Sequence, residues 1–122
     1  MTLNMGSNII VPFQINQTDL LAGTSCEIIA PVGGFISELG IIVQGDVTTG
    51  GDITVKVGTT DVDGLTVTVA NSATKGTTLV DTPTSRHDSR KVAKGGRIQV
   101  VPAAAFDMAG SVNGYLVINT AH

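Results

Sequence analysis

The clearest pattern of apolar and polar positions lies in residues 51–70. Every second residue is apolar over residues 53–57 and again over residues 65–69, which is the alternation of two half-buried strands. Gly58 and the dipeptide Asp63-Gly64 bracket the polar run between the two strands. Because glycine accepts positive φ and aspartate can bond its own backbone, we expect the chain to reverse at Asp63-Gly64 into an antiparallel hairpin.

Other apolar runs, rich in β-branched residues, predict strands along the rest of the chain. These runs are residues 8–15, 24–30, 35–44, 79–80, 90–93, 98–102 and 115–120. Residues 17–23 predict a loop or a short turn of helix capped by Thr18 or Asp19. Residues 45–51 predict a turn and residues 103–110 a loop. In the last strand, Leu116 and Ile118 should share one face.

Glycine and proline mark three special positions in these strands. Pro12 has no backbone N–H to donate to a neighbouring strand, so it places the first strand at an edge of a sheet or at a bulge. Gly40 interrupts the longest strand and indicates either a bulge or the close approach of another backbone. The pair Gly95-Gly96 supplies the positive φ values of a two-residue hairpin turn.

Together these signals give about eight strands joined by short Gly-rich turns, without an amphipathic helix. Strands joined in this way pair antiparallel, and about eight of them bury their apolar faces as two packed sheets or a closed barrel. The sequence therefore predicts an all-β fold, a single antiparallel β-sandwich that is jelly-roll-like. An immunoglobulin-like sandwich is the alternative, although the chain has no Trp and one Cys, whereas those domains use a buried Trp and a disulfide.

Length and composition fit one domain with an unusual surface. The chain has 122 residues, enough to bury roughly two-thirds of the unfolded surface. We expect a flexible N-terminal arm over residues 1–7 and the sandwich over residues 8–122. Charged residues make up 14% of the chain, against about 25% in an average soluble protein. A surface rich in Thr, Ser, Asn and Gly costs little to desolvate, which suits a protein that packs against others.

Basic residues are concentrated in one segment of an acidic chain. The net charge is −3, so nothing global favours nucleic acid or an anionic membrane. Five of the seven Lys and Arg residues are close together in sequence: Arg86, Arg90, Lys91, Lys94 and Arg97. The segment has no interleaved aromatic residues on which nucleic-acid bases could stack. It is either a solvated loop or a contact with an acidic protein surface, where arginine pairs bidentately with carboxylates.

Residues suited to catalysis or metal binding occur without a supporting motif. Cys26 lies in a predicted strand, where a buried thiol is ordinarily inert, and His87 and Asp88 lie in a polar loop. Residues 61–64 resemble part of a calcium loop but lack its further oxygen ligands, and His122 has no partner in sequence. We therefore expect no enzymatic activity, cofactor or metal. The single Cys and the missing signal-peptide pattern predict synthesis in a reducing cytoplasm, and no apolar run approaches the roughly 20 residues of a membrane span.

Three stretches of the sequence carry a resemblance to a known family. Residues 33–70, GGFISELGIIVQGDVTTGGDITVKVGTTDVDGLTVTVA, are followed by VAKGGRIQVVP and by a GYLVINT ending. In this succession of strands and Gly-rich turns, over residues 33–120, the chain resembles small β-sandwich virion proteins of tailed bacteriophages, in particular capsid decoration (cement) proteins. The resemblance implies a non-enzymatic protein that binds the outside of the expanded capsid, often as a trimer at local three-fold positions, and clamps neighbouring major capsid proteins.

From this resemblance we expect a structural virion protein on the capsid surface, made in the host cytoplasm. Its expected partners are the major capsid protein and further copies of itself in a trimer, without nucleic acid or membrane. No fixed functional residues define the family, so the basic segment stays the candidate protein contact. Two alternatives are a head-fibre or tail-fibre tip domain and a carbohydrate-binding module. The latter would need an aromatic platform for sugar stacking, and the aromatic residues are few: Phe13, Phe35, Phe106 and Tyr115.

Overall fold

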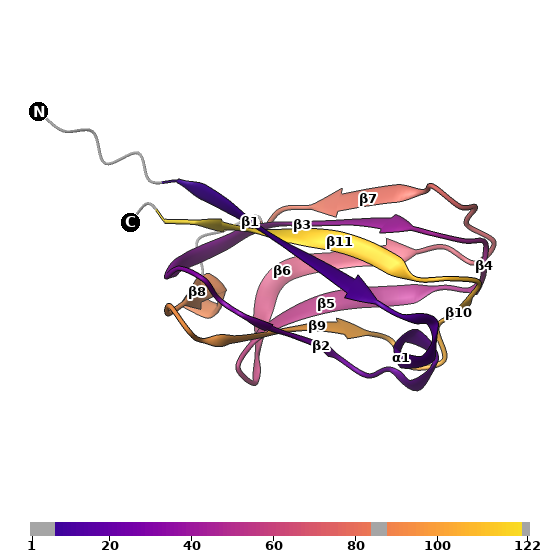
Figure 1. Ribbon diagram of the computed structural model, residues 1–122, viewed down its shortest axis with the longest axis horizontal. Coiled ribbons are helices and arrows are strands. Elements are labelled where there is room, and N and C mark those ends of the chain that lie inside the picture. Colours follow the sequence, from indigo (N-terminus) through magenta and orange to yellow (C-terminus); the bar gives the residue numbers. More distant parts are fainter. Residues whose placement is uncertain (1–6, 84–87, 121–122) are drawn as a thin grey trace, which may run out of the picture.

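Two antiparallel sheets pack face to face in the computed structural model, which describes residues 7–83 and 88–120 (Figure 1). The first, called the β1 sheet here, contains β1 (Asn8–Ile15), β11 (Val112–Asn119), β3 (Gly34–Val43) and β7 (Thr78–Asp81) in that order, and β8 (Lys91–Val92) pairs with the start of β3. The second, the β2 sheet, contains β2 (Cys26–Ile29), β9 (Arg97–Pro102), β5 (Gly51–Val57) and β6 (Thr60–Val69). A separate pair is formed by β4 (Val47–Thr49) and β10 (Asp107–Met108), and the helices are α1 (Gln17–Ala22) and the 3₁₀ turn η1 (Asp88–Arg90).

The strand order confirms the predicted jelly roll. Strands β4, β8 and β10 have only two or three residues each. Of these, β8 lies within the strand expected at residues 90–93, whereas β4 and β10 lie in segments expected as a turn and a loop. The other eight correspond to the remaining strands expected from the sequence. Numbered one to eight along the chain, these long strands follow the order 1-8-3-6 in the β1 sheet and 2-7-4-5 in the β2 sheet. This is the two-sheet order of a jelly roll, in which the first and last strands are neighbours in one sheet.

The core lies between the two sheets and includes side chains from the segments that close one end. Phe106 and Met108, from the segment expected as a loop, are almost fully buried, and so is Leu20 of α1. The expected pairing of Leu116 and Ile118 on one face is confirmed, because both point into this core. Among the described residues, no polar or charged side chain is fully buried. The hydrophobic effect therefore stabilises the fold, with little offsetting cost from the desolvation of polar groups.

The hairpin of residues 51–70 forms as predicted, but its turn lies elsewhere. The chain reverses at Gly58-Thr59, where Gly58 has φ 62°, and β6 begins at Thr60. The dipeptide Asp63-Gly64 lies inside β6, opposite the register shift between Thr54 and Lys56. The prediction of the turn was wrong because an earlier glycine, with a positive φ, already supplies a two-residue reversal.

Two further local predictions need correction. Asn16, rather than Thr18 or Asp19, caps α1, since its side-chain oxygen accepts the backbone N–H of Asp19 at 2.8 Å. Gly95-Gly96 does turn the chain, with Gly95 at φ 81°, but the turn does not make a hairpin. The strands on either side of it, β8 and β9, belong to different sheets, so the turn carries the chain across the sandwich.

Strand β1 lies at the edge of its sheet, as Pro12 predicts. The backbone N–H of Thr120 donates to the carbonyl of Ser7 at 3.0 Å. Because strand residues alternate in direction, the backbone groups of the even-numbered residues 8–14 face the open edge. The missing N–H of Pro12 therefore costs no hydrogen bond to β11. Ser7, expected in the flexible arm, also donates its N–H to Thr120 Oγ1 at 2.7 Å, while residues 1–6 lie outside the described residues.

Candidate protein-docking face

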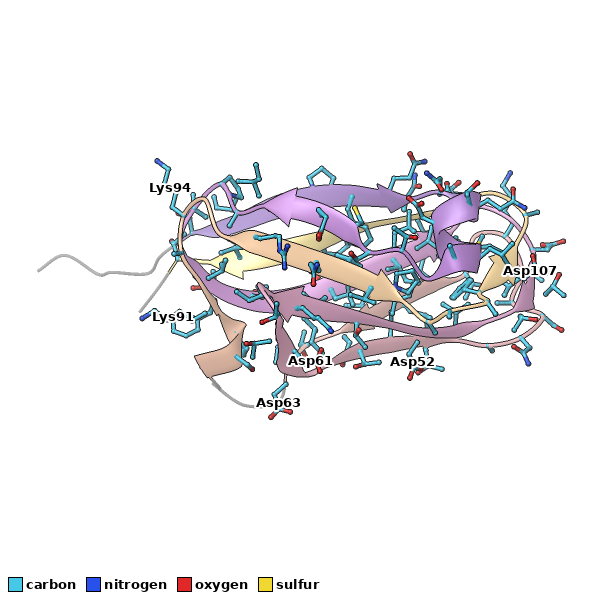
Figure 2. The ribbon with its side chains drawn as sticks, turned by 90° about the horizontal axis from the view of Figure 1, so that it is seen from below. Asp52, Asp61, Asp63, Lys91, Lys94 and Asp107 are labelled. Carbon is cyan, nitrogen blue, oxygen red and sulfur yellow. The ribbon has the colours of Figure 1, made fainter. Side chains whose placement is uncertain are left out.

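The structure distributes the predicted basic segment over different parts of the molecule. Lys91 and Lys94 are exposed at the end of the sandwich opposite Asp107 (Figure 2). Arg97 lies on the outer face of the β2 sheet, where its guanidinium approaches Glu27 at 3.9 Å. Arg86 lies outside the described residues. Thus the described basic residues do not form one continuous cationic surface.

Arg90 is turned back onto the protein. Its Nε donates to the carbonyl oxygen of Ile36 at 2.9 Å, and its guanidinium carbon lies 6.0 Å from the centre of the Phe35 ring. Hydrogen bonds from a charged donor to a backbone carbonyl, together with a cation–π contact, hold η1 against β3. In the described structure Arg90 therefore has a structural role in addition to its charge.

A different surface combines apolar character with exposure. The outer side of the β1 sheet carries apolar residues on all four long strands, and we call this set the apolar face: Ile10, Pro12, Gly40, Ile42, Val80, Tyr115 and Val117. The register places Ile10 beside Val117, which shows that the face is continuous from one strand to the next. Ile10 is 65% exposed and Val80 is 59% exposed. Exposed apolar surface that runs across several strands is typical of a protein contact.

Tyr115 and Gly40 define the centre of the apolar face. They are cross-strand partners on β11 and β3, and a Cβ atom at Gly40 would come within 2.3 Å of the Tyr115 ring. The ring therefore occupies the space that a side chain at position 40 would need. Gly40 does mark a close approach, but of a side chain and not of a backbone. The bulge in β3 is at Ser37, where the register shifts between Glu38 and Ile36.

Glu38 holds the tyrosine in this position. The Tyr115 hydroxyl donates to Glu38 Oε2 at 2.5 Å, two residues along β3 from Gly40. Hydrogen bonding to the carboxylate raises the pKa of the Tyr115 hydroxyl above its ordinary value of 10.0, with smaller contributions from burial and from the Glu38 charge. Beside the ring is a shallow hollow of about 340 Å³, lined by residues of β3, β7 and β11: Gly40, Ile41, Ile42, Thr78, Val80, Asn113, Gly114 and Tyr115.

The outer side of the β2 sheet has the opposite character. Its outward positions carry polar and charged side chains that bind one another across strands. Thr68 Oγ1 donates to Asp52 Oδ1 at 2.6 Å, and Gln99 Nε2 donates to Glu27 Oε1 at 2.9 Å. A partner that covered the part of this side around Asp52 and Thr68 would have to desolvate these groups and keep them paired, which makes that part a poor contact surface.

Side chains occupy some of the outward backbone donors along the β6 edge, and part of the β1 edge is also blocked. At the edge of β6, the backbone N–H of Thr66 donates to Asp81 Oδ2 at 2.9 Å, and that of Asp63 donates to Ser89 Oγ at 2.9 Å. At the edge of β1, Pro12 has no N–H, and the Gln14 amide faces the Cys26 thiol, whose pKa it acts to lower, while the outward backbone groups of Asn8 and Ile10 face the open edge. Edge segments blocked in this way do not pair readily with another chain. Association through a face is then favoured over association through an edge.

The residues considered for chemistry do not form a reactive site within the described structure. Cys26 is half-buried, and burial raises the pKa of its thiol, an effect that outweighs the lowering by the Gln14 amide. A raised pKa reduces the thiolate form that reacts. His87 and His122 lie outside the described residues. Within residues 7–83 and 88–120, no cluster of three or more His, Cys, Asp or Glu side chains is placed to bind a metal, and no helix is long and apolar enough to cross a membrane.

The sequence contained a signal for the apolar face that alternation alone does not reveal. Over the runs FISELGIIV and YLVIN, apolar residues occupy both inward and outward positions of β3 and β11. A strand that is apolar on both sides has an outward face that prefers a partner.

No protein-family model, curated protein sequence or solved structure matches this chain.

Proposed function

We propose that this chain is a non-enzymatic structural protein of a phage particle, which binds the outside of the capsid and stabilises contacts between major capsid protein subunits. The observation that carries the proposal is the apolar face on a molecule whose other side is mostly polar and whose sheet edges are partly blocked. The resemblance to capsid decoration proteins supplies the kind of partner. On this proposal the protein resides on the virion surface and acts as a homo-oligomer, a trimer at local three-fold positions.

The surface composition supports a contact through packing. The residues of the apolar face carry no charge, and the neighbouring Glu38 is already hydrogen-bonded to Tyr115, so a partner can cover this face at little cost of desolvating ions. Burial of its apolar side chains stabilises such a contact. The β1 half of the apolar face, with Ile10 and Pro12, is exposed next to the edge of the sheet. We assign this half to the capsid.

The test is binding to heads of the encoding phage that were assembled without this protein. Ile10→Lys places a charge on the apolar face, and Thr54→Lys places the same charge on the outer side of the β2 sheet as a matched control. We expect Ile10→Lys to weaken co-sedimentation with heads by about tenfold or more, because a buried unpaired charge is costly. Thr54→Lys should bind like the parent. Equal binding of the two variants, or no binding of the parent, would contradict the proposal.

A carbohydrate-binding module at a fibre tip is the second candidate, and one observation favours it. Asn113 and Thr78 are among the residues that line the hollow beside the Tyr115 ring, and an aromatic ring with polar residues nearby can stack on a sugar. Since Tyr115 is the one tyrosine of a chain without tryptophan, its fluorescence reports directly on this hollow. A saturable fluorescence change with host-surface glycans would favour the second candidate over capsid binding.

A further inference from the structure

One exposed apolar side chain lies outside the apolar face and within a cationic setting. Ile29, at the end of β2, is 75% exposed on the outer side of the β2 sheet. Its cross-strand neighbour is Arg97, whose side chain is 52% exposed. The turn that contains Lys94 lies next to it, since Gly95 and Ala30 are hydrogen-bonded through their backbones at 2.8 Å. Ile29 is therefore an apolar projection beside positive charge.

The hollow at the centre of the apolar face has the complementary character. Its lining includes the apolar groups of Ile42, Val80 and Tyr115, and the Tyr115 hydroxyl is bonded to one carboxylate oxygen of Glu38. The second carboxylate oxygen of Glu38 can accept a further donor, because an ionised carboxylate has about four acceptor sites. An isoleucine side chain flanked by an arginine suits the apolar lining of the hollow and the negative charge of Glu38.

Arg97 has donors to offer such a contact. Its Nη1 is 3.9 Å from Glu27 and its Nη2 is 3.4 Å from the carbonyl of Gly58, so both contacts within the chain are long. Glu27 is also bound by Gln99 at 2.9 Å. A guanidinium has five N–H donors, and a bidentate pair with a carboxylate is stronger than these long contacts.

Another exposed apolar side chain fits the hollow less well. Leu21 on α1 is 54% exposed, but that helix carries Asp19 in its first turn and no basic residue in its last. Docking α1 onto the hollow would bring Asp19 towards Glu38, and like charges at a contact are unfavourable. Ile29 also has an acidic neighbour, Glu27, but Arg97 and the turn with Lys94 lie beside it, whereas α1 carries Asp19 and no basic residue. Charge complementarity therefore favours Ile29 over Leu21.

We propose that Ile29 of one copy of this chain inserts into the hollow of a second copy and that Arg97 pairs there with Glu38. This inference rests on the proposed function, because it supplies the contact between copies of the homo-oligomer. It also divides the apolar face into two parts. The half around Val80 and Tyr115 receives the neighbouring copy, while the half around Ile10 remains available to the capsid.

The contact is heterologous, since the projection and the hollow lie on different sheets of the same molecule. Each copy then has one projection and one hollow to offer, and the chain of contacts either closes into a ring or continues. Closure with three copies gives the trimer expected at a local three-fold position. The number of copies in the complex in solution therefore shows whether this contact closes into a ring of three.

Sedimentation velocity at several protein concentrations tests the contact. Ile29→Ser should weaken self-association by about tenfold or more, whereas Leu21→Ser, the matched control on α1, should leave it unchanged. Arg97→Glu and Glu38→Arg should each weaken it, and the double variant should recover most of the parent affinity. Thermal unfolding of each variant identifies any that do not fold, and Ile29→Ser keeps the test decisive because it changes an exposed position.

Several outcomes would overturn the inference. A parent protein that stays monomeric up to about 1 mM, the weak limit of specific association, has no such contact. Equal effects of Ile29→Ser and Leu21→Ser, or no recovery in the double variant when both single variants fold, would also exclude it. Head binding separates this result from the proposed function. A parent that binds heads without self-association supports the proposed function and overturns the contact between copies. A parent that associates through Ile29 but does not bind heads supports the contact and overturns the proposed function.

Discussion

The two outer sides of the sandwich differ in what a partner would have to remove. On the β2 sheet, outward side chains already bind one another, as in the pairs of Thr68 with Asp52 and Gln99 with Glu27. On the β1 sheet, the outward side chains of Ile10, Ile42 and Val80 are apolar, so a partner that covers them displaces water and breaks no side-chain hydrogen bond. The comparison shows that two sheets of similar length, sharing one core, can differ in the cost of removing water from their outer sides. The difference lies wholly in the outward positions.

The same contrast extends to the details of packing. Gly40 lets the Tyr115 ring lie on the backbone of β3, so the apolar face is smooth at its centre with a hollow beside the ring. The corresponding positions of β5 carry Thr54 and Lys56, whose side chains stand out from the sheet. Three substitutions, each with a control or a direct readout, test this contrast between the two sheets.

Filling the space at Gly40 should have the largest effect on stability. In Gly40→Val the new Cβ would overlap the Tyr115 ring, which must leave its site and give up the Glu38 hydrogen bond. Overpacking of this kind costs about 1–3 kcal/mol. Thr54→Val, which adds no volume at an outward position of the β2 sheet, should change stability by less than about 0.5 kcal/mol. Urea denaturation of both variants measures the difference, and equal midpoints would show that the ring does not depend on Gly40.

Removing the carboxylate that closes the β6 edge should have a smaller effect on stability. In Asp81→Ala the amide of Thr66 loses its acceptor, which costs about 1 kcal/mol and exposes the edge. Asp52→Ala, which removes a carboxylate from the outer side of the same sheet, is the control. Only Asp81→Ala should also raise the rate of aggregation, measured by light scattering on warming. Equal aggregation of the two variants would mean that Asp81 does not protect the edge.

Replacing Glu38 should alter titration more than folding. The pKa of Tyr115 is raised in the folded protein, so the unfolded chain loses the phenol proton first. The resulting stabilisation is therefore fully present below about pH 10 and is lost as the pH rises through the folded pKa. In Glu38→Gln the midpoint should move down towards its ordinary value. Absorbance at the phenolate band measures this cleanly because Tyr115 is the one tyrosine, and an unchanged midpoint would show that Glu38 does not set it.

The sequence predicted the fold better than the contact surface, and the reason is physical. Alternation over residues 53–57 depends on burial against a core, so it identifies strands and their number. The position of a turn depends on which glycine first adopts positive φ, and Gly58 precedes Asp63-Gly64. Short strands such as β4 and β10 follow from pairing with a distant partner, which no local pattern records.

The candidate contact surface could be located only from the order of the strands in the sheets. Lys91 and Arg97 are close in sequence, yet the turn between them crosses from one sheet to the other. A charge run in the sequence therefore did not become a charge patch. The apolar face depends on residues such as Gly40, Val80 and Tyr115, which come from three distant strands. Their assembly into one surface follows only from the strand order, even though the two-sided apolar character of β3 was visible in the sequence.

The pairing of Ser7 with Thr120 makes the strand order almost circular. Because β1 and β11 are neighbours and begin and end at the same end of the sandwich (Figure 1), the chain could be joined from His122 to Met1 with the remaining eight terminal residues as the connection. New ends could then be opened at Gly58-Thr59 without breaking a strand. Such a permuted chain would keep every sheet neighbour and both outer faces. It would also carry any fused cargo on the β5–β6 turn, away from the edge strand β1.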